Sequence, residues 1–350
     1  MKITAVVVTY NRLELLKHGI ECLKKQRKLS NIIIVNNGST DGTTEWLKEA
    51  SPCPSEGGEK KNSSAAKTPT KHTSISPPSE GSGEAPAALT VIHQSNVGGS
   101  GGFYTGIKAA YESGADWIWC MDDDVFPRED CLDRLLEHID EPNAGILSPR
   151  RILDGKVFTH EFCHFNFTNP FASMHGKKLG VSAGSSSTKH TYISLPSEGR
   201  GEALPIVGCD FEGPFISRKV VEKIGLPNKE LFIFCDDTDY CLRAHLAGFN
   251  LYYIPDALMD KHLFFSDDTW TTRNQKKKWK RYYQIRNETY MNHHYGNNWG
   301  VRYLRGLLGV VGYYIPALLS MPFTKAWKMS DLKVLWQAYQ DGIHERLGKR

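Results

Sequence analysis

Residues 117–124 read Trp-Ile-Trp-Cys-Met-Asp-Asp-Asp, an apolar run that leads directly into three carboxylates. The run is short and aromatic and lies between Gly114 and Pro127, so it predicts a buried β-strand. Ligands of open α/β sheets gather beyond the carboxyl ends of the strands. Three adjacent negative charges repel one another there unless a hard divalent cation neutralises them. The alternative for such a triplet is a solvated acidic turn, and the surrounding pattern decides between the two.

Apolar strands alternate with helical patterns on the N-terminal side of this run. Strands are predicted at residues 3–9, 32–35, 89–92 and 116–121, and helices at 12–25, 43–49 and 102–113. Further helices are predicted at 128–139, 217–224 and 237–247. Such alternation with near-continuous apolar strands is typical of an α/β fold, in which helices cover both faces of a mostly parallel sheet.

The bulk composition narrows the class of protein. The 350 residues carry a formal net charge of only +4, which argues against a dedicated nucleic-acid binder. Eight cysteines are present without a C-x-x-C pair, and Met1-Lys2 leads directly into a strand without a secretory signal. These features predict a protein of the reducing cytosol.

Two segments interrupt the pattern. Residues 51–88 and about 179–205 are rich in small and polar residues, and we expect both to be disordered low-complexity inserts. Residues 70–85 and 188–203 are identical at 13 of 16 positions. We therefore infer that one element was inserted twice, which makes His72 and His190 poor ligand candidates.

Polar loops follow the other three predicted strands. They are Thr9-Tyr10-Asn11-Arg12, residues 36–42 (Asn-Asn-Gly-Ser-Thr-Asp-Gly) and residues 96–103 (Asn-Val-Gly-Gly-Ser-Gly-Gly-Phe). Glycine permits close approach of the backbone to a ligand, and helix N-termini favour anions. The glycine run alone is a weak signal, because it lacks the P-loop lysine and does not follow the first strand. Together with the Asp triplet, however, the loops favour a nucleotide diphosphate and a metal.

The ordered set of motifs resembles family 2 glycosyltransferases, which have the GT-A fold. The segments are T-Y-N-R, N-N-G-S-T-D-G-T, N-V-G-G-S-G-G-F, W-C-M-D-D-D-V and C-D-D-T-D-Y-C-L-R-A. The third and fourth are most similar to the galactofuranosyltransferase and rhamnosyltransferase branch, and the resemblance covers residues 1–265 apart from the inserts. It implies a catalytic domain at 1–268, and inverting transfer of a sugar from a nucleotide diphosphate with Mn²⁺ or Mg²⁺.

The resemblance also implies roles for particular residues. Asp122 and Asp124 would hold the metal and His262 would complete its site, while Asp123 would face the donor sugar or a backbone partner. Asn36 stands where the family commonly has an Asp that contacts the base, which leaves uracil and thymine both open. The implied nucleotide-sugar-binding set is Thr9, Tyr10, Asn11, Arg12, Asn36, Asn37, Asp41, Asn96, Gly98, Gly99, Gly102, Phe103, Asp122 and Asp123.

A second acidic cluster, Asp236-Asp237-Thr238-Asp239, precedes a predicted helix. An inverting displacement needs a base for the acceptor hydroxyl, and a carboxylate suits that role. Family position makes Asp237 the candidate base and Asp236 its orienting partner, although Asp is also common as a helix cap. Asp239 is predicted as a cap or an acceptor contact. Asp210 and Glu212 would bind acceptor hydroxyls or be ordinary loop carboxylates.

The C-terminal region, 269–350, is expected to be helical. Residues 269–286 hold seven Lys or Arg and no acidic residue, and residues 303–323 are almost entirely apolar. The apolar stretch is long enough to span a bilayer, but Gly and Pro interrupt it, so a helix that lies at the interface or packs in the core is favoured. We expect peripheral contact with anionic lipid on the inner face of the cell membrane and no nucleic-acid partner.

The sequence therefore predicts a cytosolic-side, metal-dependent inverting glycosyltransferase that extends a surface polysaccharide or its lipid-linked precursor. UDP-galactofuranose is the expected donor, with dTDP-rhamnose as the alternative. A catalytically silent, nucleotide-binding GT-A scaffold is the alternative from another class. A sugar-1-phosphate nucleotidylyltransferase is disfavoured because the N-terminus lacks a G-x-G-x-R loop.

Overall fold

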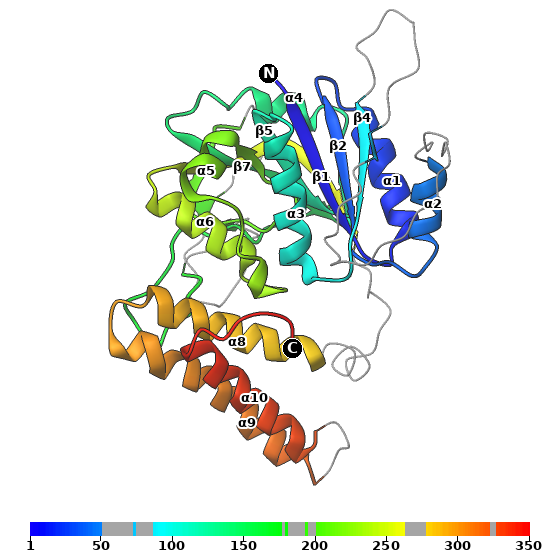
Figure 1. Cartoon of the computed structure of the whole chain (residues 1–350). Helices are drawn as coiled ribbons and strands as arrows, with labels where there is room; N and C mark the ends of the chain where they lie inside the picture. Colours follow the sequence, from blue (N-terminus) through cyan, green and yellow to red (C-terminus); the bar gives the residue numbers. More distant parts are fainter. Residues whose placement is uncertain are drawn as a thin grey trace, which may run out of the picture.

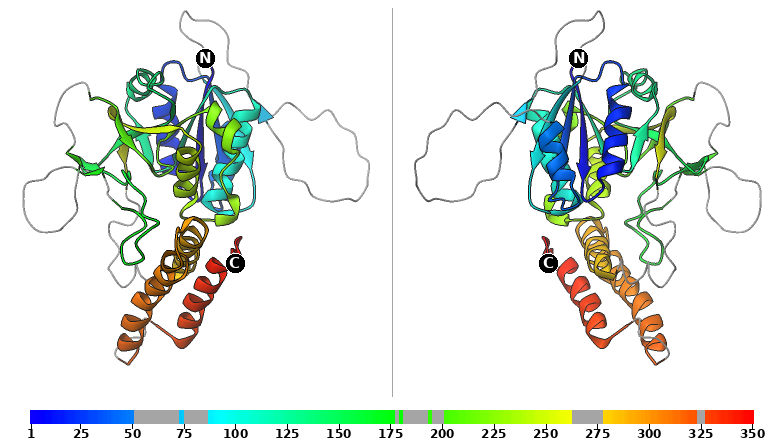
Figure 2. Two further views of the ribbon diagram at one scale, coloured as in Figure 1. Left: turned by 90° about the vertical axis from the view of Figure 1, so that its left-hand side faces the viewer. Right: turned by 90° about the vertical axis from the view of Figure 1, so that its right-hand side faces the viewer.

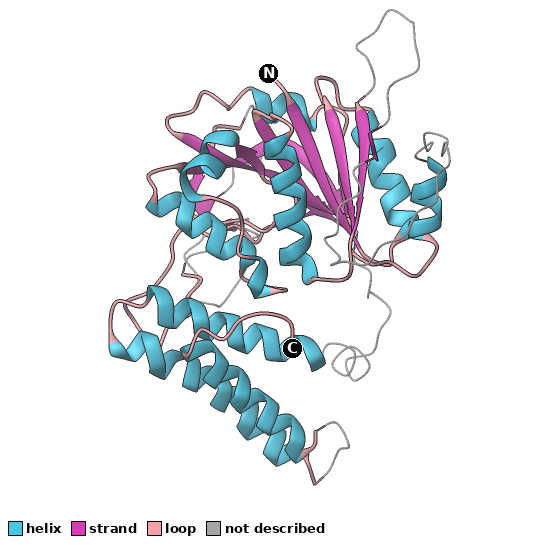
Figure 3. Cartoon of the chain, in the orientation of Figure 1, coloured by secondary structure: helices cyan, strands magenta, loops and turns pink. Residues whose placement is uncertain are grey.

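An 11-stranded mixed sheet forms the centre of the molecule (Figures 1 and 3). This computed structural model describes residues 1–50, 73–74, 87–176, 179–180, 193–194, 201–262, 278–322 and 327–350. Strands β1 (Ile3–Thr9), β2 (Asn31–Asn36), β4 (Ala88–His93) and β5 (Trp117–Asp122) pair in parallel in the order β5-β1-β2-β4. Their parallel pairing confirms the predicted α/β class and the predicted N-terminal strands.

Mixed pairing extends the sheet beyond β5. Strand β12 (Phe215–Ser217) runs antiparallel between β5 and β7 (Ala144–Leu153), and β13 (Asn250–Lys261) runs parallel to β7. The short strands are β3 (Thr73–Ser74) beside β4, β6 (Val125–Pro127) and β11 (Leu204–Ile206) beside β13, and β8 (Lys156–Phe158) beside β7. Strands β9 (Leu179–Gly180) and β10 (Ile193–Ser194) form a separate pair.

Helices cover both faces of the sheet, with a hydrophobic core on each side. Helices α1 (Leu13–Lys24), α2 (Thr43–Ala50) and α4 (Cys131–Leu136) pack on one face. Helices α3 (Gly98–Glu112), α5 (Arg218–Ile224) and α6 (Asp236–Leu246) pack on the other, with the short 3-10 helix η1 (Lys229–Leu231) before α6. Alternate residues of β1 enter different cores, Ala5 and Val7 on one side and Val6 and Val8 on the other, as the pleat requires.

A layer of C-terminal helices lies beyond the carboxyl ends of the parallel strands (Figure 1). It contains α8 (Lys278–Tyr295), a π-helical segment η2 (Gly300–Arg305), α9 (Gly306–Ser320) and α10 (Met329–Ile343). Figure 2 shows that α9 and α10 project from the sheet as a hairpin. The Asn287 side chain of α8 donates to the carbonyls of Leu231, Ile233 and Phe234 at 2.8–2.9 Å, which fastens the layer to the segment before α6.

Helix α3 begins at Gly98, four residues before its predicted start at Gly102. The glycine run forms the first helical turns because it lets this helix approach other backbone closely. A Cβ on Gly98 would lie 1.9 Å from the Phe232 carbonyl oxygen, and one on Gly102 would lie 2.5 Å from Val8 Cγ1. The glycines therefore serve packing as well as any ligand.

The second predicted insert is shorter than expected. Leu204–Ile206 pairs with β13 as an edge strand, and Leu179 is buried, so both ends of the 179–205 segment belong to the fold. Most of the two predicted inserts, and the predicted domain boundary at 268, lie outside the described residues.

Replacing Gly106 with Ala is expected to lower the free energy of unfolding by about 1–3 kcal/mol through overpacking. Its Cβ would lie 2.2 Å from Val6 Cγ1 and 3.2 Å from Val35 Cγ2, where α3 meets the sheet. Gly99→Ala is the matched control, because a Cβ there meets nothing within 4 Å. Urea unfolding of both variants should show a loss for Gly106→Ala alone, and equal losses would contradict this packing account.

Candidate functional site

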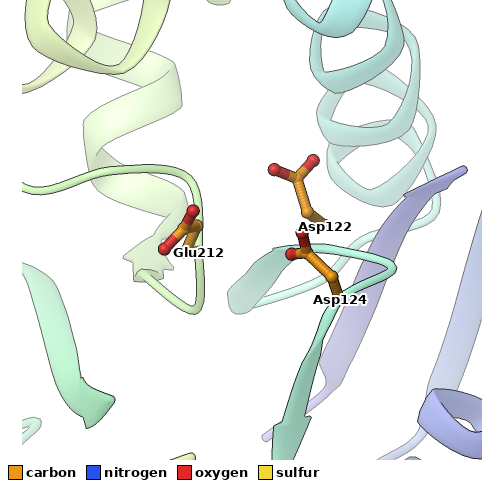
Figure 4. Close-up of side chains that lie close together, drawn as sticks. All are labelled: Asp122, Asp124 and Glu212. Carbon is orange, nitrogen blue, oxygen red and sulfur yellow. The ribbon is translucent and has the colours of Figure 1, made fainter. Parts of the chain in front are cut away.

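Three carboxylates lie close together at the end of β5. Asp122 ends this strand, Asp124 lies in the following turn, and Glu212 lies in the loop before β12 (Figure 4). One carboxylate oxygen from each lies within 4.8 Å of the other two. Burial raises the pKa of Asp122 well above its usual value, and the charges of Asp124 and Glu212 raise it further. Mutual repulsion of this kind is what a bound divalent cation would relieve.

The residues present fit such a cation. Asp124 Oδ1 is buried and accepts no hydrogen bond within the described part of the chain, as expected for an oxygen reserved for a metal. Lys261 Nζ lies 3.6 Å from this oxygen and 2.6 Å from Glu212 Oε1. Arg12 Nη1 lies 3.0 Å from Asp124 Oδ2. The two basic side chains thus offset part of the negative charge.

His262, the predicted third metal ligand, contacts this cluster through its backbone. Its amide donates to the Asp124 carbonyl at 2.9 Å, while its exposed ring is absent from the group of ligand atoms found among the described residues. Glu212 contributes the third oxygen of this group instead. The role of His262 stays a prediction, and Glu212, predicted to bind acceptor, becomes a candidate metal ligand.

Asp123 has a different environment from its two neighbours. It is 4% exposed and accepts hydrogen bonds from Thr9 Oγ1 at 2.7 Å, the Tyr10 amide at 3.4 Å and Arg12 Nη1 at 2.8 Å. These contacts join the ends of β1 and β5. Of the two roles predicted for Asp123, the structure therefore favours the contact with protein over the contact with the donor sugar. Thr9, predicted to bind the nucleotide sugar, is one of the residues that hold Asp123 in place.

The loop after β2 is held by its own side chains. Asn36 accepts from the Ser39 amide at 3.0 Å, and Asp41 accepts from the Thr43 amide at 3.1 Å at the start of α2. Asn37 donates to the Gly98 carbonyl at 2.9 Å and so ties this loop to the glycine run. These three residues were predicted to contact the nucleotide sugar, and their side chains hold together the loops at this edge of the sheet.

The other residues predicted to bind the nucleotide sugar differ in their exposure. Gly98, Gly102 and Phe103 are buried against protein, which argues against direct contact with the nucleotide sugar. Asn11 accepts from the Thr40 amide at 2.7 Å and Asn96 accepts from the Gly98 amide at 3.0 Å. Tyr10 is 46% exposed, and a Cβ on Gly99 would meet nothing within 4 Å, so these two residues are the predicted contacts to the nucleotide sugar that the geometry leaves open, whereas Arg12 already pairs with Asp123 and Asp124.

The candidate base Asp237 and its predicted orienting partner Asp236 lie in the first turn of α6, after Cys235 in the left-handed region at φ 62°. Burial raises the pKa of Asp237 well above its usual value, and the nearby charges of Asp210 and Asp236 add to the rise. Burial likewise raises the pKa of Asp236 to about 6. Asp237 Oδ1 accepts from Thr238 Oγ1 at 3.1 Å, and Oδ2 accepts from no residue that the structure describes. This oxygen is thus available to an acceptor hydroxyl.

Asp239, predicted as a cap or an acceptor contact, has both oxygens occupied. Arg243 Nε donates to one at 2.9 Å and the Tyr295 hydroxyl donates to the other at 2.7 Å, and the side chain is buried. These bonds join α8 to α6. They argue against the acceptor contact and make Asp239 a structural link.

Arg151 is the principal residue of the site that the sequence patterns did not predict. This fully buried guanidinium contacts Glu161 Oε1 at 2.7 Å, Glu212 Oε2 at 2.6 Å and Asp210 Oδ2 at 3.2 Å. His160 Nδ1 also contacts Asp210, at 2.9 Å. Arg151 therefore connects the metal side of the site with the side of the candidate base. The adjacent arginines Arg150 and Arg151 in the mostly apolar run 144–153 were the available signal in the sequence.

Arg151→Met is expected to lower the free energy of unfolding by about 3–5 kcal/mol, because Glu161 would keep a buried unpaired charge. The double variant Arg151→Met/Glu161→Met should regain most of this stability. Its affinity for Mn²⁺ should stay low, since Glu212 still lacks its buried partner. Denaturant unfolding and metal titration of both variants check these outcomes, and full metal affinity in the double variant would contradict a positioning role.

Comparison with known proteins identifies the family. The family described as "Glycosyltransferase like family 2" matches residues 79–291, and "Glycosyl transferase family 2" matches residues 4–61. The chain belongs to glycosyltransferase family 2. Together these matches contain all three carboxylates of Figure 4 and the candidate base. Membership confirms the predicted family, and the observed sheet with its flanking helices agrees with the GT-A class.

Curated relatives share modest sequence identity with this glycosyltransferase. Galactofuranosyltransferase GlfT1 of Mycolicibacterium smegmatis is 26% identical over 70% of this chain and 66% of its own length. The dTDP-rhamnosyl transferase RfbF of Shigella flexneri is 27% identical over 44% of this chain and 45% of its own length. The chain thus spans less than two thirds of these curated relatives. Mannosyltransferase PcManGT of Pyrobaculum calidifontis, solved with GDP-Man and Mn²⁺, shares 12% identity at a TM-score of 0.47, covering 99% of this chain and 88% of that one.

Proposed function

We propose that this chain transfers galactofuranose from UDP-galactofuranose, with inversion and with a divalent metal, to a hydroxyl of a glycan or lipid-linked glycan. The observation that carries the proposal is that one buried arginine, Arg151, contacts two neighbouring groups of carboxylates. Asp122, Asp124 and Glu212 form the first group, Asp237 and Asp210 form the second, and Arg151 contacts both Glu212 and Asp210. A leaving diphosphate and an attacking hydroxyl need two such neighbouring sites.

Each side of the site has its own chemical task. Asp237 Oδ2 would take the proton of the acceptor hydroxyl as its oxygen attacks the anomeric carbon. Burial favours the protonated form of Asp237, which strengthens it as a base once ionised. A divalent cation held by Asp122, Asp124 and Glu212 would offset the charge of the departing diphosphate. Arg12 contacts Asp124, one of these carboxylates, and is placed to assist there.

Similarity to a galactofuranosyltransferase over 70% of the chain supports the preferred donor. The shorter match to a dTDP-rhamnosyl transferase keeps dTDP-rhamnose as the second candidate. Release of UDP or TDP from a panel of nucleotide sugars, with and without Mn²⁺ and a glycan acceptor, tests both. We expect turnover with UDP-galactofuranose that needs Mn²⁺. Turnover of no donor, with nucleotide binding intact, would instead support the scaffold alternative.

We also propose that the hairpin of α9 and α10 rests on the inner membrane surface. Gly300–Ser320 is the one helical stretch in the described chain that is long and apolar enough to cross a membrane, and 22% of its apolar 18-residue window is buried. Val310 and Ala317 pack inward, whereas Leu308, Val311, Ile315, Leu318 and Leu319 are exposed. One packed side and one exposed apolar side fit a helix that lies in the interface. The exposed Trp299 and Trp336 suit the same position.

Leu318→Glu/Leu319→Glu is expected to reduce binding to vesicles of phosphatidylcholine and phosphatidylglycerol by more than about tenfold. Each leucine side chain that enters the bilayer contributes about 1.5–3 kcal/mol to the binding free energy. Leu246→Glu is the matched control, since Leu246 is 67% exposed but lies at the end of α6. Sedimentation with vesicles measures the bound fraction. Equal loss in both variants would count against the hairpin as the contact surface.

A further inference from the structure

A cavity separates the loop at residues 170–175 from helices α8 and α9. Its volume is about 340 Å³, and its wall contains Phe171, Glu288, Asn292, Leu308, Gly309 and Tyr313. Ser173, His175, Thr289 and Arg305 also line it, so the wall mixes aromatic and aliphatic surface with several polar side chains. Polar groups set among apolar surface are typical of small-ligand sites.

The polar groups of this cavity favour a neutral, hydroxyl-rich head over an anion. Arg305, the cation in the wall, already donates to the carbonyls of Asn166 and Asn169 and to Asn292 Oδ1. Glu288 accepts one hydrogen bond, from Gln284 at 3.2 Å, within the described part of the chain. An acidic oxygen is thus free for hydroxyl donors, whereas both terminal nitrogens of the guanidinium are occupied, and its Nε, which has no partner among the described residues, is buried away from the solvent.

The cavity opens onto the apolar face of α9. Leu308 and Gly309 belong to the cavity wall and also to the exposed side of the helix that continues through Val311, Ile315 and Leu319. A Cβ on Gly309 would meet nothing within 4 Å, so the mouth is open at this position. A ligand with a polar head in the cavity and a hydrocarbon chain along α9 would match both surfaces.

The cavity also lies close to the chemistry. Met174 of the cavity wall and Cys235 belong to one buried hydrophobic cluster. Cys235 directly precedes α6, where the candidate base lies. A head group in the cavity is therefore near the site where an acceptor hydroxyl is needed.

We propose that this cavity binds the sugar head of a glycosylated lipid, with the lipid chain along the exposed face of α9. The inference rests on the proposed function, because it assigns the place where a lipid-linked acceptor enters. It adds a binding site formed by the loop at 170–175, α8 and α9, distinct from the carboxylates that would hold metal and donor.

The test uses n-octyl β-D-glucopyranoside below its micelle concentration as the probe, with glucose and n-octyl phosphate for comparison. Isothermal titration to the full chain should give an affinity for octyl glucoside at least about tenfold above that for either comparison compound, since only this probe fills both surfaces. Gly309→Phe should weaken it by about tenfold or more by blocking the mouth. Gly312→Phe, on the same exposed face but outside the cavity wall, should change it by less than about twofold.

Three results would overturn the assignment: no binding of octyl glucoside, equal effects of the two phenylalanine variants, or equally tight binding of octyl phosphate. Both glycines lie within α9 in open space, so a larger side chain is compatible with folding, which circular dichroism confirms. UDP binding to the wild-type chain is measured separately. If the chain binds UDP but no octyl glucoside, the proposed function stands without this site. If it binds octyl glucoside but no UDP, the site stands and the proposed function is removed.

Discussion

Asp124→Asn is expected to weaken Mn²⁺ binding by about a hundredfold or more and to reduce sugar transfer by about a thousandfold, since metal stabilisation of the leaving group contributes several kcal/mol. The change removes a charge from the buried oxygen that accepts no hydrogen bond within the described residues. Titration with Mn²⁺ in the presence of UDP measures the first effect, and release of UDP measures the second. The metal titration needs no acceptor, whereas the transfer assay uses the glycan acceptor of the donor panel.

Asp154→Asn is the control for Asp124→Asn. Asp154 is an exposed turn residue at φ 50°, a conformation that Asn also tolerates, so the charge change is the same but lies outside the site. We expect wild-type metal affinity in this control. Wild-type affinity in Asp124→Asn itself would remove the candidate metal centre.

The identity of the third metal ligand follows from a paired comparison. The structure favours Glu212, so Glu212→Gln should weaken Mn²⁺ binding at least about tenfold, whereas His262→Ala should have the smaller effect. The reverse order would restore the ligand set that the family resemblance implies. Either order identifies which side chain joins Asp122 and Asp124.

Asp237→Asn is expected to reduce transfer by about 10²–10⁴-fold, the usual contribution of a general base, while UDP affinity changes little. Because burial raises the pKa of Asp237, the wild-type rate should fall as the pH drops through that raised pKa, where the base becomes protonated. The variant should lose this acid limb. Initial rates across a pH series, with UDP binding measured in parallel, separate chemistry from donor affinity.

Asp239→Asn provides the control within the same helix. Its carboxylate bonds Arg243 and Tyr295, so the variant should lower the melting temperature and largely retain the rate per folded molecule. If Asp239→Asn instead abolished transfer in folded protein, the structural role of Asp239 would be wrong. Full activity of Asp237→Asn would exclude it as the base.

The parallel half of the sheet follows from local sequence patterns. Each of β1, β2, β4 and β5 is a short, near-continuous apolar run whose length and composition identify a buried strand without reference to distant residues. The polar loops at their carboxyl ends follow from the same patterns. For this reason the amino-acid order alone suffices to place Asp122 and Asp124 at one edge of the sheet.

Other features depend on residues that are distant in sequence and meet only in the folded chain. Glu212 approaches Asp124 because β12 pairs antiparallel with β5, and Arg151 reaches Glu212 from β7, a strand on the other side of β12. No local pattern encodes these contacts, since each depends on strand order and register. The same holds for Gly98, whose need for glycine comes from the Phe232 carbonyl, and for Asp239, whose partner Tyr295 lies on α8. Local patterns thus specify the strands and the carboxylates at their ends. Only the tertiary structure determines that Glu212 faces Asp122 and Asp124 and that Arg151 holds Glu212, because long-range packing fixes the distances between these side chains.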